Sequence, residues 1–202
     1  MKNFIWDFDG TLFNSYPHIS KAFCMMLDNH NRDYNPKEVT DALLVNFQYA
    51  FDKYALTESE IKEFRSYTDT VELQPEIMPY HDAEKILKYV SEHNGVNYIY
   101  THRNTETLVF YLKRYDMLKY FKAYVTSDYG FQKKPSPDGI EYIIKEYQLD
   151  KNATIMIGDR EIDVLSGKGA GIYGGLVKRD GRVENTKADY VFTTLDDVMI
   201  LI

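Results

Sequence analysis

Two aspartates near the start of the chain have the spacing of a catalytic pair. Asp7 and Asp9 close a short apolar run, and Gly10 and Thr11 follow them. An apolar run that ends in a glycine-containing turn predicts a buried strand entering a loop. A turn after Asp7 would separate the two side chains around one reacting group, which suits one nucleophile and one acid/base. Two solvated loop aspartates are the alternative interpretation of this segment alone.

Polar side chains also follow the other predicted strands, at the point where each strand ends. Because the carboxyl ends of parallel strands lie at one edge of a sheet, we expect these side chains to converge with the two aspartates. The set comprises Thr101-His102-Arg103 after a strand at 96–100, Lys133-Lys134 after a strand at 123–126, and Asp159 to Asp163 after a strand at 153–157.

This set of residues predicts phosphoryl transfer to a carboxylate. Three or four convergent carboxylates need a cation, and oxygen ligands of this kind suit Mg²⁺, which also binds substrate phosphate oxygens. Lys134 adds a second positive charge. The hydroxyl of Thr101 and the N–H that follows it can donate hydrogen bonds to an anion.

The elements that must position these residues are those of an α/β fold. From residue 80 onward, predicted strands alternate with helices of about ten to fifteen residues, which is typical of βαβ units and a Rossmann-like parallel sheet. A final edge strand is expected at 190–192, before a C-terminal helical turn. Residues 16–79 contain helical patterns only, including a stretch over 39–54 with or without a break and a capping box from Thr57 to Glu60. We therefore expect an α/β core of residues 1–15 and 80–202 with an inserted all-helical cap at 16–79.

Composition and charge limit the partners and the cellular compartment that we expect for this protein. The 202 residues carry a net charge of -7, which does not favour nucleic acid or an anionic membrane surface as a partner. The single cysteine, Cys24, excludes an internal disulfide and fits a reducing compartment. The start of the chain is too short for a signal peptide, and no stretch approaches a membrane span. We expect a cytoplasmic protein.

Four motifs occur in the order found in one known family. The motifs Asp7-Phe8-Asp9-Gly10-Thr11, Thr101, Lys134-Pro135 and Gly158 to Asp163 resemble those of the haloacid dehalogenase-like hydrolases, and most closely their phosphoglycolate phosphatase-like branch. The resemblance spans nearly the whole chain. The helical insert is similar to the type I cap of that family, which closes over the site and selects the substrate.

The resemblance implies a role for each matching position. Asp7 would be the nucleophile that forms an aspartyl-phosphate, and Asp9 would be the general acid and base. Mg²⁺ would be held by the carboxylates of Asp7 and Asp159 and by the backbone carbonyl of Asp9. Asp163 would support the metal shell through water or a lysine.

The phosphoryl oxygens would be held by the hydroxyl of Thr101 and the N–H of His102. Lys134 would orient the nucleophile and neutralise charge, and we choose it over Lys133 because it directly precedes a proline. Alternative interpretations are a helix cap for Asp163, a solvated charge for Lys133, and contacts through the backbone alone for His102 and Arg103.

The predicted function is that of a magnesium-dependent phosphatase acting on a small phosphorylated metabolite. Asp9 favours this activity, since related dehalogenases lack an acid/base aspartate at that position. A sugar phosphomutase of the β-phosphoglucomutase type is the second hypothesis, and a non-catalytic, phosphate-responsive binding module is the third. Asn14-Ser15, in place of the more usual Asp-Ser, and the glycine-rich segment 166–171 depart from the family pattern. Neither the substrate nor the oligomeric state is indicated by a motif.

Overall fold

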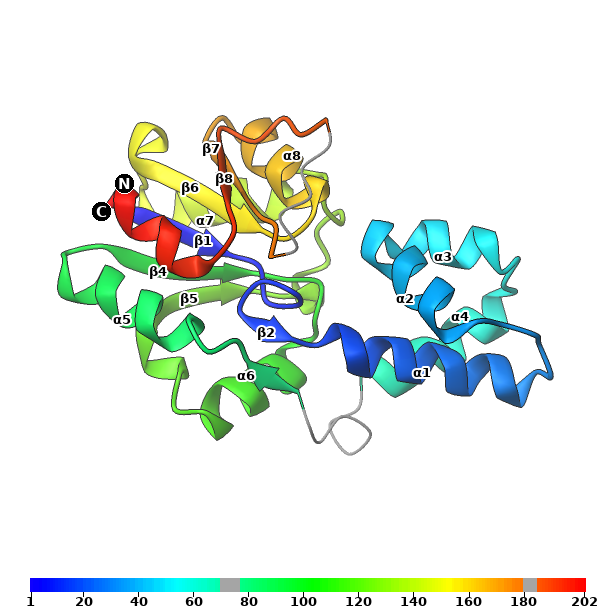
Figure 1. Cartoon of the computed structure of the whole chain (residues 1–202). Coiled ribbons are helices and arrows are strands. Elements are labelled where there is room, and N and C mark those ends of the chain that lie inside the picture. The colour runs from blue at the N-terminus through cyan, green and yellow to red at the C-terminus, as the bar shows by residue number, and fades with distance from the viewer. Residues whose placement is uncertain (70–76, 180–184) are drawn as a thin grey trace. The chain divides into compact units, whose positions relative to one another are not determined.

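The chain divides into two units, and the backbone passes from one to the other twice. The computed structural model describes residues 1–69, 77–179 and 185–202, so residues 70–76 of the predicted helical insert lie outside the described residues. The first unit comprises Met1–Phe13 and Pro79–Ile202, and the second comprises Asn14–Met78 (Figure 1).

A parallel sheet forms the centre of the first unit. Among the described residues it has six strands in the order β5-β4-β1-β6-β7-β8. All five neighbouring pairs are parallel, and the four residues of the central strand are buried, as expected for a sheet covered on both faces. This confirms the predicted α/β fold. The strands are β1 (Asn3–Trp6), β4 (Val96–Tyr100), β5 (Phe121–Val125), β6 (Thr154–Gly158), β7 (Tyr173–Val177) and β8 (Tyr190–Phe192).

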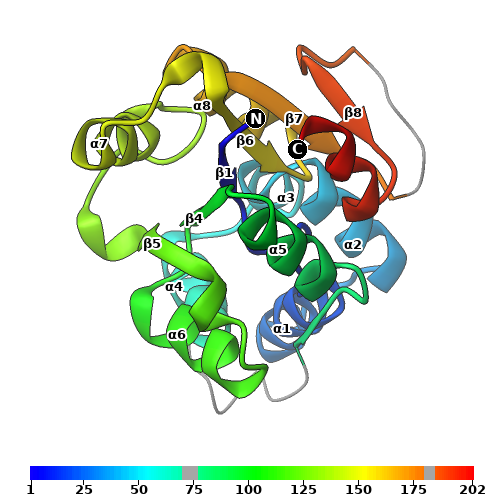
Figure 2. The ribbon, with the colours of Figure 1, turned by 90° about the vertical axis from the view of Figure 1, so that its left-hand side faces the viewer.

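Helices cover both faces of this sheet (Figure 2). On one face Ile5 packs in a cluster with Ile140 and Ile143. On the other face Asn97 accepts a hydrogen bond from the Trp6 indole at 2.9 Å and donates to the Leu87 carbonyl at 3.0 Å. No helix in the described parts of the chain is long and apolar enough to cross a membrane. The helices of this unit are α5 (Ala83–Glu92), α6 (Thr105–Arg114), α7 (Asp138–Tyr147) and α8 (Glu161–Gly169).

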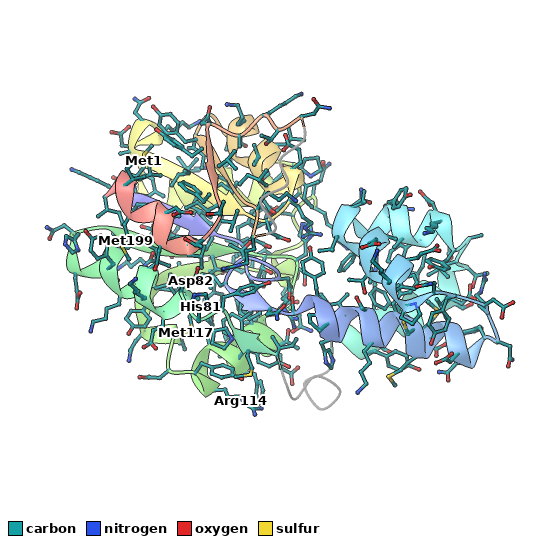
Figure 3. The ribbon with its side chains drawn as sticks, viewed as in Figure 1. Met1, His81, Asp82, Arg114, Met117 and Met199 are labelled. Atoms are coloured by element: carbon teal, nitrogen blue, oxygen red, sulfur yellow. The ribbon has the colours of Figure 1, made fainter. Side chains whose placement is uncertain are left out.

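The chain termini meet at one end of the first unit. The N-terminal ammonium of Met1 donates to the carbonyl of Leu201, at the end of the 3₁₀ helix η5 (Leu195–Leu201), and Figure 3 labels Met1 beside this region. The buried carboxylate of Asp82 accepts the Leu195 N–H at 2.8 Å and the Arg179 guanidinium at 3.0 Å. The start of α5, the segment after β7 and the C-terminal helix are thereby held together.

The second unit is a cluster of helices around an aromatic core. The rings of Phe23 and Phe51 lie 5.2 Å and 5.8 Å from the ring of Phe64, measured between centroids. Asn46 interrupts the predicted helical stretch at 39–54, and its side chain accepts the Tyr49 N–H at 2.7 Å to begin a new helix. The helices are α1 (Tyr16–Asn29), α2 (Pro36–Val45), α3 (Phe47–Lys53) and α4 (Glu58–Thr68).

Two short strands connect the units and were not predicted. β2 (Phe13–Asn14) pairs with β3 (Met78–Pro79), so the expectation that residues 16–79 contain no strand is wrong at its last residues. The pairing continues in a hydrogen bond from the Tyr80 N–H to the Leu12 carbonyl at 2.9 Å. A two-residue strand is too short to show an alternating pattern, and its pairing also depends on a partner far along the chain.

The predicted capping box at the start of α4 is confirmed, and its glutamate also forms an ion pair with Arg32. The Glu60 carboxylate accepts the Thr57 N–H at 2.7 Å, and Arg32 donates to both of its oxygens at 2.6 Å and 2.9 Å. Burial by itself raises the pKa of Glu60. The hydrogen bonds from Thr57 and Arg32 outweigh burial and bring the pKa down to about 2.

Glu60 should make the stability of the protein depend on pH. A carboxylate whose pKa is lower in the folded state than in the unfolded chain stabilises the fold at neutral pH, and this contribution is lost as the pH falls through the folded-state pKa. Glu60→Gln should reduce the free energy of unfolding near neutral pH by about 1.5–3 kcal/mol. The difference from wild type should narrow as the pH falls from about 4.5 towards 2, the value that the network gives Glu60. Urea unfolding followed by circular dichroism measures both quantities, with the exposed Glu58→Gln as the control.

Candidate active site

The predicted site residues lie at the carboxyl ends of neighbouring strands. β1 runs between β4 and β6, and the register pairs Trp6 with both Ile99 and Ile157, so the three strands end at nearly the same level. Asp7 follows β1 directly, Thr101 follows β4, and Asp159 follows β6. Parallel pairing therefore brings residues that are far apart in sequence to one edge of the sheet.

Asp7 is a buried carboxylate whose two oxygens have different surroundings. Only 2% of the residue is exposed. Its Oδ1 accepts a hydrogen bond from the Lys134 ammonium at 2.6 Å, whereas its Oδ2 has no hydrogen-bond partner among the described residues. Buried carboxylate oxygens are normally satisfied, so this oxygen is the natural place for an electrophile or a metal ion.

Lys134 connects two aspartates. Its ammonium donates to Asp7 and, at 2.7 Å, to Oδ1 of Asp163, and all three side chains are buried. The other oxygen of Asp163 accepts the Arg160 N–H at 3.1 Å at the start of α8, so Asp163 caps this helix and binds the lysine as well. Lys133 is exposed.

Burial and charge separate the pKa values of the two aspartates. Burial raises the pKa of Asp7 to about 7, against the opposing effect of Lys134. Burial also acts on Asp163, but the charges of Lys134 and Arg160 outweigh it and lower the pKa of Asp163. Asp163 is therefore ionised at a lower pH than Asp7.

The carboxylates of Asp7, Asp159 and Asp163 form a group able to hold a cation. One oxygen from each lies within 4.8 Å of the others. The hydroxyl of Thr11 is 3.4 Å from Asp159 Oδ1, which helps to orient that side chain. An all-oxygen donor set with an unsatisfied buried oxygen fits a hard divalent ion such as Mg²⁺. Both oxygens of Asp163 already accept hydrogen bonds, so Asp7, whose Oδ2 has no hydrogen-bond partner among the described residues, has more capacity to bind a cation.

The carboxylate of Asp9 is bound by Arg103. The Arg103 Nε lies 2.9 Å and 3.0 Å from the two carboxylate oxygens of Asp9, and Nη2 lies 2.8 Å from Oδ1. The interpretation that Arg103 makes contacts through its backbone alone is therefore wrong. The available signal was that Arg103 lies in a loop predicted to converge with Asp9. The sequence does not show where the side chain of a loop residue points.

The residues predicted to bind phosphate lie on the loop after β4. Thr101 is buried, and its hydroxyl oxygen accepts the Arg103 N–H at 3.2 Å, which leaves the hydroxyl hydrogen available to donate. Nε2 of His102 accepts the Lys134 N–H at 2.9 Å, so the backbone-only interpretation is wrong for this side chain too. Burial, aided by Lys134, lowers the pKa of His102 to about 3, which keeps the ring neutral and able to accept.

Comparisons with known proteins identify the family. The sequence model of the haloacid dehalogenase-like hydrolase family matches residues 4–177 of this chain. The chain therefore belongs to the haloacid dehalogenase-like hydrolase family, as its motifs predict.

The relatives of this chain include a pyrophosphatase and a phosphoglycolate phosphatase. The chain is 23% identical to the pyrophosphatase PpaX of Halalkalibacterium halodurans, over 98% of this chain and 95% of that protein. It is 27% identical to the phosphoglycolate phosphatase of Neisseria gonorrhoeae, over 82% of this chain and 75% of that protein. The predicted enzyme class, a phosphatase within this family, agrees with these names.

A solved structure of low sequence identity has the same fold. It is a haloacid dehalogenase-like family protein from Streptococcus pneumoniae, with a TM-score of 0.82 and 20% identity over 99% of this chain and 97% of that one.

Gly158 is required for the close approach of Asp163. A Cβ at residue 158 would lie 2.2 Å from the Asp163 carboxyl carbon, far inside van der Waals contact. Gly158→Ala should therefore displace Asp163 from Lys134 and reduce the free energy of unfolding by about 1–3 kcal/mol, as overpacking does. Gly169→Ala in the same region is the control, since its Cβ would meet Pro137 at an ordinary 3.4 Å. Urea unfolding of both variants checks this expectation, and equal midpoints would contradict it.

Proposed function

We propose that the protein is a magnesium-dependent phosphatase that hydrolyses a small phosphorylated metabolite through an aspartyl-phosphate on Asp7. The observation that carries this proposal is the state of the Asp7 carboxylate. Lys134 holds Oδ1 at 2.6 Å, and the buried Oδ2 has no hydrogen-bond partner among the described residues. An oriented carboxylate oxygen at the carboxyl end of the central strand is suited to attack phosphorus.

The reaction would proceed in two displacements. In the first, an Asp7 oxygen bonds to phosphorus while the ester P–O bond breaks, and Asp9 gives its proton to the departing oxygen, which leaves as an alcohol. In the second, water attacks the aspartyl-phosphate and Asp9 takes a proton from that water. Inorganic phosphate leaves and the Asp7 carboxylate is restored. Acid/base help of this kind contributes typically about 10²–10⁴-fold in rate.

The approach of two anions is the main barrier that this site must lower. Two unit charges about 4 Å apart repel by roughly 4 kcal/mol at an effective dielectric of about 20. Lys134 offsets part of this repulsion. The Thr101 hydroxyl and the backbone N–H of His102 would donate to the phosphoryl oxygens. Mg²⁺, held by the carboxylates of Asp7 and Asp159 and by the carbonyl of Asp9, would neutralise further charge when bound. Asp163 would support this arrangement through its bond to Lys134.

We propose further that the helical insert at residues 16–79 acts as the cap that selects the substrate. The names of the relatives support a small anionic phosphate compound, since they include pyrophosphatases and phosphoglycolate phosphatases.

Phosphate release from a panel of substrates tests the function. The panel contains phosphoglycolate, pyrophosphate, sugar phosphates and nucleoside monophosphates, each with Mg²⁺ or with EDTA. Wild type should release phosphate only with Mg²⁺, and Asp7→Asn should lower kcat by at least about 10³-fold, because the nucleophile is lost. The exposed Glu146→Gln should retain wild-type activity.

The other hypotheses give different results in this assay. Transfer of the phosphoryl group to an added hexose phosphate, without release of inorganic phosphate, would support the mutase. No release and no transfer with any compound would contradict an enzymatic function and favour the binding module.

Metal binding can be tested without turnover. Mg²⁺ at about 100 times its dissociation constant should raise the free energy of unfolding by about 2.7 kcal/mol, because it binds the folded state alone. Asp159→Asn should abolish most of this increase, whereas Glu146→Gln should retain it. Thermal unfolding at increasing Mg²⁺ concentration is the measurement, and an undiminished shift in Asp159→Asn would exclude this residue as a ligand.

A further inference from the structure

Arg103 makes an ion pair with Asp9 that none of the four motifs accounts for. The guanidinium is almost fully buried, with 6% of the side chain exposed, while 20% of the Asp9 side chain is exposed. Three hydrogen-bond contacts of 2.8–3.0 Å join the two groups. Charge-assisted contacts of this length to a planar guanidinium restrict the orientation of a carboxylate.

The position of Arg103 is itself held from several sides. Its guanidinium carbon lies 5.2 Å from the ring centroid of Phe8 and 5.5 Å from that of Tyr111. Its backbone N–H donates to the Thr101 hydroxyl at 3.2 Å, and its carbonyl accepts the Ser127 N–H at 2.9 Å. The residue is therefore a rigid support that contacts both Asp9 and a residue proposed to bind phosphate.

The two oxygens of Asp9 are bound unequally. Oδ1 accepts from both Nε and Nη2, whereas the only contact to Oδ2 among the described hydrogen bonds is the one from Nε at 3.0 Å. A carboxylate oxygen has about two lone-pair sites, so Oδ2 keeps the greater capacity for another partner. Proton transfer by Asp9 would use this oxygen.

We propose that Arg103 is a positioning residue that fixes the plane of the Asp9 carboxylate, so that Oδ2 exchanges the proton with the leaving group and with water. This inference rests on the acid/base role proposed for Asp9. An ion pair with a purely structural role would affect stability and would reduce the turnover of all substrates in the same proportion. If Arg103 positions Asp9, its replacement should reduce turnover most for substrates whose leaving group needs a proton.

The experiment compares two substrates in Arg103→Met. The first is p-nitrophenyl phosphate, whose leaving group departs without a proton, and the second is the alkyl phosphate that wild type hydrolyses fastest in the panel. The ratio of their kcat/KM values reports the step in which the leaving group departs, whatever the rate of aspartyl-phosphate hydrolysis. Arg103→Met should lower kcat/KM for the alkyl phosphate at least about tenfold more than for p-nitrophenyl phosphate.

Several variants separate positioning from structural damage. Arg103→Lys keeps the charge without the planar fork and should give a smaller change in the ratio. Arg114→Met removes an exposed arginine that stacks on Tyr115, at 5.9 Å, and should leave the ratio unchanged (Arg114 is labelled in Figure 3). In an Asp9→Asn background, Arg103→Met should change the ratio no further, because the group that it positions is already lost.

The outcomes distinguish this inference from the function on which it rests. If Asp9→Asn changes the ratio but both Arg103 variants leave it at the wild-type value, the positioning role is overturned and the acid/base role stands. If Asp9→Asn leaves the ratio unchanged, the acid/base role of Asp9 fails and the inference fails with it. An equal loss on both substrates in Arg103→Met also overturns the inference, because a structural ion pair would produce that result.

Discussion

The buried ammonium of Lys134 is the interaction on which the rest of the site depends. It lies between Asp7 and Asp163, at 2.6 Å and 2.7 Å, and all three side chains are shielded from water. Two carboxylates could not both remain charged in this position without a cation, since an unpaired buried charge costs several kcal/mol. Lys134 thereby allows the carboxylate of Asp7 to be buried at the place where the proposed reaction would occur.

The backbone around this lysine is shaped to permit the contact. Gly158 ends β6 without a side chain, and the Asp163 carboxyl group occupies the space that a Cβ would fill. Asp163 also accepts the Arg160 N–H and so ties the start of α8 to the lysine. A second ion pair, between Asp9 and Arg103, holds the other aspartate of the opening motif. Two aspartates two residues apart thus have different cationic partners, from different loops, and this suits them to different roles.

The fold could be predicted from local patterns, and the site only in part. Strands alternating with amphipathic helices after residue 80 indicated a parallel sheet, because side-chain periodicity is a local property. Parallel pairing then implied that Asp7, Thr101 and Asp159 would lie at one edge, and the structure brings them there. The pairing of β2 with β3 could not be seen, since two-residue strands have no pattern of their own. The partner of Asp9 was missed for a similar reason, because the direction of a loop side chain depends on packing against Phe8 and Tyr111.

The sequence by itself determined the family and the α/β core, and it supplied the hypotheses of a helical insert and of a set of residues able to do chemistry, since each depends on residue type, spacing and order along the chain. Only the tertiary structure decided which charges pair. Lys134 and not Lys133 reaches Asp7, Arg103 binds Asp9 through its side chain, and Asp163 both caps a helix and holds the lysine. The physical reason is that pairing of buried charges is set by distances of a few ångströms between segments far apart in sequence, and those distances exist only after the sheet has formed and the helices have packed on it.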